Sequence, residues 1–371
     1  MTTTWPTREN SSPIGQTAKT TLADSCAALS AGYRDRATTE AITRILAGPA
    51  EGRTDATGAL DELQELLEQI RQTPEGDLRV SRMNSFVRTL GRSDNLAAFL
   101  ELMRASLKEG PGAHGVSERS RAGRSHCIYG WAGQSLVLAS DVHALPSTEP
   151  AGDGVQEFMG GAVAEWHASL HIWQPNPEAL GFESTKRFEP GTIVEPPHSH
   201  PFSFVSYVSV GELRQSIYEE DSAETPSGTG DRYQDVDLER VGGVWPPHDE
   251  YVPSRLRTVE ERVRLEQGQS YFMSPDMIHD VEVDRDIASE RPTITLFLCS
   301  ETVKVPVSYL VPSMAEFHRD NPEILSAAQA LDPEVWDAKL AATARYLRGE
   351  SDELRLGDIV NCGSSYGFMN R

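Results

Sequence analysis

Three histidines have the residue type and spacing expected of a metal site. His198 and His200 form an H-x-H pair at the start of a predicted strand, within GTIVEPPHSHPFSFVSYVSVGEL. Side chains two residues apart on a strand point to the same face, so both imidazoles can reach one cation. His279 follows another strand and a turn that contains Pro275. If the strands close into a barrel, His279 can join the pair, and three imidazoles can hold a divalent first-row metal.

The H-x-H pair also has a purely structural interpretation. His198 and His200 could simply cap a strand beside Pro197 and Pro201. We favour the metal site because a polar pair that faces a barrel interior costs free energy unless it is hydrogen-bonded or metallated. If His279 stood alone, a structural role without a metal would be favoured. Beside the H-x-H pair, we favour a role as a metal ligand.

Two other pairs resemble the start of a site with two histidines and one carboxylate. His248 and Glu250 form H-x-E, and His318 and Asp320 form H-x-D. The first pair lies in a Pro-rich stretch, and the second lies in a helical segment with no histidine after it. We expect both pairs to be surface residues, which disfavours a 2-oxoglutarate enzyme.

Several other polar side chains are candidates for the same site. Tyr207 and Tyr271 lie on the two strands that carry the histidine motifs, and we consider both as catalytic residues. Arg255 and Arg257 end a polar stretch, and a guanidinium near a metal would orient a substrate carboxylate through paired hydrogen bonds. We therefore consider both arginines as substrate-binding residues, although most arginines are solvated.

His171 is a further catalytic candidate, with two interpretations left open. In EWHASLHIWQP it shares one strand face with His167, Ser169 and Trp173. If this face points inward, His171 could donate a proton or contact substrate. If it points to water, it is only the polar side of a half-buried strand. We slightly favour the second interpretation because antiparallel sheets commonly expose one face.

Composition and charge exclude several classes of protein. The 371 residues include 34 Lys and Arg against 56 Asp and Glu, which gives a net charge of −22. This charge disfavours binding to nucleic acid or to an anionic membrane. No stretch resembles a signal peptide or a membrane span, and the four cysteines form no C-x-x-C pair, so we expect a cytoplasmic protein with reduced thiols.

The spacing of apolar residues changes along the chain. It is helical before residue 110, for example at Leu60, Leu63, Leu67 and Ile70, and period 2 in short segments after residue 124. We expect a mobile tail at 1–20, a helical region at 21–110, a β barrel at 124–312 with an insertion at about 220–255 that acts as a lid, and a C-terminal helical appendage and tail at 313–371.

The order of these motifs resembles that of the cupin superfamily. The matching positions, in chain order, are Gly191, His198, His200, Gly211, Gly268, Pro275 and His279. The resemblance implies a mainly β fold, the double-stranded β-helix or jelly-roll barrel. Phe204 stands where many cupins have a glutamate ligand, which favours a site of three histidines alone.

Among cupins with three histidines, the chain resembles the cysteine dioxygenase group. IHDVE at 278–282 and PTITLFL at 292–298 match segments of that family, as do the helices before the barrel. Two features depart from it. Phe297 and Cys299 replace the His and Tyr of the last strand, and there is no counterpart of the crosslinking Cys between residues 202 and 206. We therefore expect a larger, partly apolar substrate in contact with Phe204 and Phe297, instead of cysteine.

The predicted function is a metal-dependent cupin oxygenase or dioxygenase that uses O₂ on a small polar or partly apolar molecule. Fe(II) is the expected metal, with Zn, Mn or Ni as alternatives. One rival is a Zn or Mn cupin isomerase or hydrolase, and a second is a cupin module that binds a ligand without turnover. The sequence gives no oligomeric state.

Overall fold

The computed structural model describes the helical N-terminal part, the strands and one C-terminal helix. The described residues are 21–108, 125–126, 133–134, 137–139, 166–174, 192–200, 202–220, 231–237, 252–288, 290–300, 307–310 and 333–356. The pairs His248/Glu250 and His318/Asp320 and the predicted tail at 1–20 lie outside them. None of the described helices is long and apolar enough to cross a membrane.

In the described N-terminal part of the chain, five helices precede the strands, as the helical spacing predicts. They are α1 (Leu22–Ala31), α2 (Arg36–Ala47), α3 (Ala56–Arg71), α4 (Asp77–Leu90) and α5 (Ser93–Lys108). Thr21, Asp35 and Asp55 cap α1, α2 and α3, since each side chain accepts a hydrogen bond from a backbone N–H of the first turn. A later helix, α11 (Pro333–Leu347), packs against α5. The short helix α8 (Arg285–Ala288) follows a strand.

The strands are antiparallel and form two main sheets. The first sheet has the order β10 (Ser270–Met273), β6 (Phe204–Val210), β12 (Thr293–Cys299), β4 (His167–Trp173) and β3 (Val137–Ala139). The second has six strands whose pairings run in a closed ring, in the order β11 (Ile278–Asp284), β5 (Thr192–His198), β13 (Val307–Leu310), β8 (Asp231–Asp237), β9 (Val252–Glu266) and β7 (Glu212–Glu220). A small sheet pairs β1 (Ser125–His126) with β2 (Gly133–Gln134).

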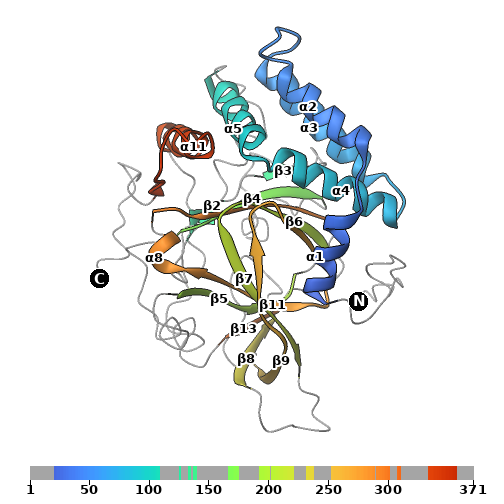
Figure 1. The fold of residues 1–371 in the computed structure, drawn as a ribbon, viewed down its shortest axis with the longest axis vertical. Helices are drawn as coiled ribbons and strands as arrows, with labels where there is room; N and C mark the ends of the chain where they lie inside the picture. Colours follow the sequence, from blue (N-terminus) through green and yellow to red (C-terminus); the bar gives the residue numbers. More distant parts are fainter. Residues whose placement is uncertain are drawn as a thin grey trace, which may run out of the picture.

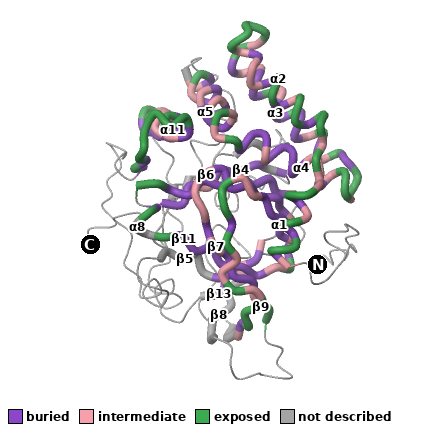
Figure 2. Tube along the Cα trace, viewed as in Figure 1, coloured by how far each residue is buried: buried purple, intermediate pink, exposed green. Residues whose placement is uncertain are grey.

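The five-stranded sheet is buried on both faces. The helix-facing core joins one set of alternating side chains to the helices: Leu170, Val205, Tyr207 and Leu296 pack with Phe86, Val87, Leu90 and Leu100. The inner core joins the other set to the second sheet: Phe204, Val208, Tyr271 and Phe297 pack with Leu213, Ile217, Val281 and Val283. Figure 1 shows α4 and α5 on the side of β4 and β6 opposite β5 and β13, and Figure 2 shows the buried residues concentrated in these layers.

Helix α1 covers the free edge of the five-stranded sheet at β10. The Ser25 hydroxyl accepts a hydrogen bond from the Phe272 N–H at 2.7 Å and donates one to the Phe272 carbonyl at 3.2 Å. Leu22 and Cys26 of the same helix are part of the inner core. Helix α1 therefore satisfies backbone groups that an edge strand would otherwise leave unpaired.

The turn between β6 and β7 requires glycine. Gly211 has a φ of +75°, and a Cβ at this position would lie 2.8 Å from Thr293 Oγ1 and 3.1 Å from Thr293 Cα. A side chain would therefore be disfavoured by the backbone conformation and by the contact. This is one of the glycines in the motif found in the sequence.

The polar stretch at about 220–255, expected to be an insertion, contains strand residues where the structure describes it. Residues 231–237 form β8, and 252–255 begin β9. The two segments pair with each other, for example Tyr233 with Ser254 and Asp231 with Leu256. Polar composition alone suggests a loop here, but cross-strand pairing extends the sheet through this stretch. The lid function and the other domain boundaries remain predictions.

Candidate metal centre

The three histidines singled out in the sequence come together with their ring nitrogens facing one another. The Nε2 atom of His200 lies 3.2 Å from that of His198 and 3.1 Å from that of His279. The candidate ligand atoms all lie within 4.8 Å of one another. Within the described part of the chain, these residues form a possible metal-binding group that contains no carboxylate.

The pairing of β5 with β11 brings the histidines together. His198, the last residue of β5, is the cross-strand partner of His279 on β11, and His200 follows two residues later. Between Glu195 and His198, strand β5 has one residue more than the facing part of β11. Pro196 and Pro197 occupy this irregularity, and proline cannot donate a ladder hydrogen bond.

The surroundings of His279 favour its neutral imidazole. His279 is 3% exposed. Burial, and secondarily the nearby His198, hold the pKa of His279 well below its usual value. Neutral imidazoles can direct lone pairs at a metal ion, and protonated ones cannot.

The arrangement passes a simple test of fit for a metal. Imidazole nitrogens bind a divalent ion such as zinc at about 2.0 to 2.1 Å, and the two Nε2 separations of 3.1 and 3.2 Å are short enough for neighbouring rings to share one ion. Each ring nitrogen carries either one proton or one lone pair, so His200 Nε2 cannot form a good hydrogen bond with both neighbouring Nε2 atoms at once. One divalent ion would satisfy all three nitrogens.

Aromatic rings surround the histidine group on the inner core side. The ring of Phe204 lies 4.8 Å from His200 and 6.3 Å from His279, centroid to centroid. Phe202 stacks on His200 at 5.4 Å, and Phe297 lies 5.6 Å from Phe204. Phe204 and Phe297, predicted as substrate-binding residues, therefore line the inside of the sheets beside or near the histidines.

The two tyrosine candidates lie on opposite faces of the sheet. Tyr271 belongs to the inner core, 6.1 Å from Phe204, and its hydroxyl accepts a hydrogen bond from Gln215 at 3.0 Å. Tyr207 faces the helices, with the Arg88 guanidinium 5.5 Å from its ring centroid. Alternation along β6 thus places Tyr207 on the face opposite Phe204, away from the histidine group, and its catalytic role remains a prediction that this placement disfavours.

His171 points inward, so the solvent-facing orientation that we slightly favoured is wrong. Its ring lies 4.7 Å from Phe297 and 5.6 Å from Trp173, and the side chain is half-buried. The helices cover the other face of β4, which leaves both faces of the strand buried. His171 thus lies near the aromatic group, and its imidazole is not one of the three that face one another.

The arginine candidates on β9 do not join the histidine group. Arg257 is 53% exposed and forms an ion pair with Glu219 on the neighbouring strand. Arg255 is half-buried on the same strand, where its cross-strand partner is Arg232 of β8. The structure places Arg257 at the surface, and no described contact joins either arginine to the histidines; their substrate-binding roles remain predictions.

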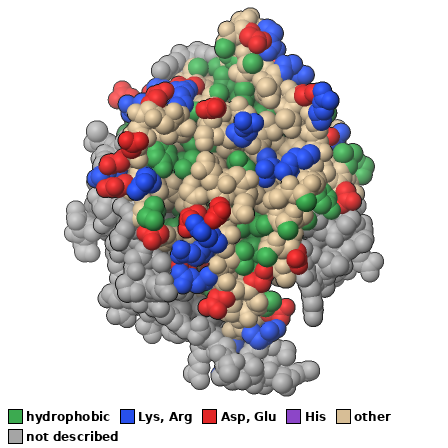
Figure 3. Space-filling view, viewed as in Figure 1, with side chains coloured by type: hydrophobic (Ala, Val, Ile, Leu, Met, Phe, Trp, Pro, Cys, Tyr) green, Lys and Arg blue, Asp and Glu red, His purple; other side chains and the backbone are tan. Residues whose placement is uncertain are grey.

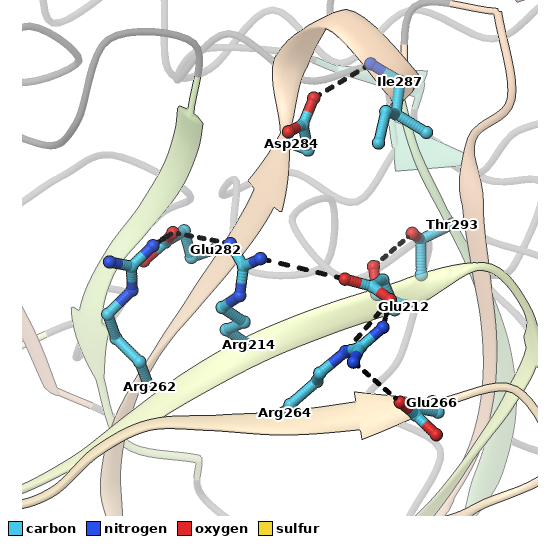
Figure 4. Close-up of polar contacts among 9 residues, drawn as sticks. All are labelled: Glu212, Arg214, Arg262, Arg264, Glu266, Glu282, Asp284, Ile287 and Thr293. Atoms are coloured by element: carbon cyan, nitrogen blue, oxygen red, sulfur yellow. Dashed lines mark hydrogen bonds and ion pairs between the residues drawn. The ribbon is translucent and has the colours of Figure 1, made fainter.

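A charged network covers the outer face of β7, β9 and β11 (Figure 4). The carboxylate of Glu282 on β11 accepts hydrogen bonds from Arg262 at 2.6 Å and Arg214 at 3.3 Å. Arg264 pairs with Glu212 in the same network. Figure 3 shows basic and acidic side chains interspersed on one face of the molecule. These pairs link strands on the face opposite His279, since Glu282 and His279 are an odd number of residues apart.

Asp280 directly follows the third histidine and is not among the site residues predicted from the sequence. Its carboxylate is 4% exposed and accepts hydrogen bonds from the Ser216 N–H at 2.7 Å and the Tyr218 hydroxyl at 2.6 Å. Burial raises the pKa of Asp280 to about 6, although these two hydrogen bonds oppose the shift. The acidic residue in IHDVE was a visible signal, but its cross-strand partners were not.

Comparisons with known proteins give matches to solved structures only. No family model and no curated protein matches the chain. The similar structures include an oxalate decarboxylase variant of Bacillus subtilis, with 9% identity over 48% of this chain and 28% of that chain and a TM-score of 0.22. They also include an 11S globulin of Wrightia tinctoria, with 11% identity, 64% and 39% coverage, and a TM-score of 0.27. An oxalate oxidase shares 12% identity, with 59% and 76% coverage and a TM-score of 0.24.

The matched region spans well under half of the oxalate decarboxylase and of the 11S globulin. At these identities and scores the matches give no information on activity. The histidine geometry alone supports the function proposed below.

Proposed function

We propose that this protein is a metal-dependent oxygenase with a cupin barrel, acting in the cytoplasm on a small, partly apolar molecule with O₂. The observation that supports the proposal best is the convergence of three imidazole Nε2 atoms. That of His200 lies 3.1 Å from that of His279 and 3.2 Å from that of His198. His198, His200 and His279 would hold the ion. When bound, iron(II) would supply the one-electron chemistry with O₂ that no side chain provides.

The residues around the histidines suit an apolar part of a substrate. Phe202, Phe204 and Phe297 are each less than 10% exposed and form a connected set of rings from His200 to His171. Such a surface excludes water from the reaction and binds apolar groups through burial. His171 lies at the far end of this set, where its half-buried imidazole could accept or donate a proton.

The proposed relationship to thiol dioxygenases does not extend to their substrate. Phe297 and Cys299 belong to the inner core where that family has hydrogen-bonding side chains on the last strand. A small zwitterion would find few polar partners on this wall. We therefore propose a distant relative of that group that acts on a larger molecule.

Oxygen consumption by the metal-loaded protein tests the proposal. The protein is loaded with iron(II) or with zinc under anaerobic conditions, and O₂ uptake is followed with a panel of small aromatic and aliphatic acids, enols and thiols. The proposal predicts substrate-dependent O₂ uptake with iron, none with zinc, and none with iron-loaded His279→Ala. Turnover without O₂ uptake in both metal forms would favour an isomerase or hydrolase, and tight binding without turnover would favour a binding module.

A further inference from the structure

We propose that Asp280 is a positioning residue that fixes the direction of the His279 imidazole. Its carboxylate joins β11 to β7 on the face of β11 opposite the His279 ring, at the point where both strands pair irregularly with their other neighbours. This role rests on the metal site proposed above and adds a residue to it that makes no contact with a bound ion.

The contacts of Asp280 connect two strands through a side chain. One carboxylate oxygen accepts the backbone N–H of Ser216, and the other accepts the hydroxyl of Tyr218. The backbone register of β7 and β11 pairs His279 with Ile217 and Glu282 with Arg214. Asp280 lies between these two pairs. Its carboxylate therefore connects β11 to β7 in the part of the ladder between them. Hydrogen bonds to a buried carboxylate are stronger than those between neutral groups.

The ladders that join β11 and β7 to their other neighbouring strands are irregular at the level of Asp280. On one side, the register of β11 with β5 shifts between His279 and Val281. On the other side, the register of β7 with β9 shifts on both sides of Ile217. Arg262 of β9 has a φ of +50° there, and its N–H donates to the Ser216 hydroxyl at 3.2 Å. Ser216 therefore bonds to two elements. Its side chain bonds to the irregular part of β9, and its backbone N–H bonds to Asp280 on β11.

This arrangement explains why the third histidine needs a separate support. His198 and His200 lie on or directly after β5, whereas His279 alone comes from β11. Because the β5–β11 ladder is irregular beside His279, the connection of β11 to β7 fixes where that imidazole points. A displacement of a ligand by a fraction of an ångström is enough to weaken a metal site.

The test compares two Asp280 variants with a control on the same strand. Asp280→Ala removes both acceptors, whereas Asp280→Asn keeps an oxygen that can accept the Ser216 N–H. Glu282→Gln is the control, since Glu282 is also buried on the outer side of β11 but bonds only arginine side chains among the contacts given above. Cobalt(II) affinity and the visible absorption of bound cobalt(II) are measured well below the unfolding temperature of each variant.

We expect Asp280→Ala to weaken cobalt(II) binding about tenfold, the size of effect seen when a residue supporting a metal ligand is removed. Its cobalt(II) absorption should also shift, because the direction of one imidazole changes. Asp280→Asn should recover most of the affinity, and Glu282→Gln should leave both affinity and absorption unchanged. Wild-type affinity and absorption in Asp280→Ala would overturn the role of Asp280.

Two further measurements keep the inference separate from the metal proposal. If Asp280→Ala does not fold, Tyr218→Phe removes one of the two bonds, and an unchanged cobalt(II) absorption in that variant would overturn the inference. If the wild-type protein binds no cobalt(II), the proposed function fails, and the ring resonances of ¹⁵N-labelled histidine then test Asp280 directly. We expect the His279 resonance to move in Asp280→Ala and not in Glu282→Gln, and an unmoved resonance would overturn the inference.

Discussion

Removal of one histidine should abolish high-affinity metal binding without unfolding the protein. In His279→Ala the ring nitrogen 3.1 Å from His200 Nε2 is lost, and one of the three converging nitrogens is removed. Structural zinc sites with four ligands bind with about 10 to 16 kcal/mol, so one ligand contributes about 3 to 4 kcal/mol. This corresponds to a loss of about 10² to 10³ in affinity.

The assay is competition with a chromophoric chelator near neutral pH, where unperturbed imidazoles are mostly neutral. His171→Ala is the matched control, since it removes another inward-facing imidazole, one that is half-buried and contacts Phe297 and Trp173. We expect wild-type metal affinity in His171→Ala and folded, metal-poor protein in His279→Ala. Equal affinities in His279→Ala and the wild type would refute the assignment of the three ligands.

Three other predictions concern the frame and the substrate. Ser25→Ala should destabilise the protein by about 2 kcal/mol in chemical denaturation, because it leaves the buried backbone groups of Phe272 unpaired, whereas exposed Ser30→Ala should have little effect. Burial lowers the pKa of Lys339 from 10.5 to about 8, so stability should rise as the pH increases from about 8 to 10.5. Lys339→Met should add about 1 to 3 kcal/mol near neutral pH and abolish this rise, and an unchanged pH profile would contradict the explanation. Iron-loaded protein should not oxidise cysteine or 3-mercaptopropionate efficiently, and robust O₂ uptake with either thiol would contradict the apolar site.

The sequence predicted the histidine cluster because its signal is local and short. The H-x-H pair puts two rings on one side of the chain, and the strand pattern around His279 allowed the third ring to meet them. The helices could also be predicted, since Leu60, Leu63 and Leu67 repeat at helical spacing and are buried in α3.

The faces of individual strands could not be predicted from the same pattern. Alternation shows that Phe204 and Tyr207 point in opposite directions, but it does not tell which direction is the interior. Helices cover one face of the five-stranded sheet and bury Tyr207, whereas His171 lies half-buried on the other face, against Phe297. The pairing of β8 with β9 and the contacts of Asp280 depend on residues far apart in the chain, and no local signal contains them.

The most direct test of the metal centre is diffraction from crystals grown with iron(II) under anaerobic conditions, with data collected on both sides of the iron absorption edge. We predict one anomalous peak between the Nε2 atoms of His198, His200 and His279 in the wild type, and no such peak in His279→Ala. An iron-loaded wild-type crystal with no peak at this position, or with its peak at other residues, would contradict the assignment.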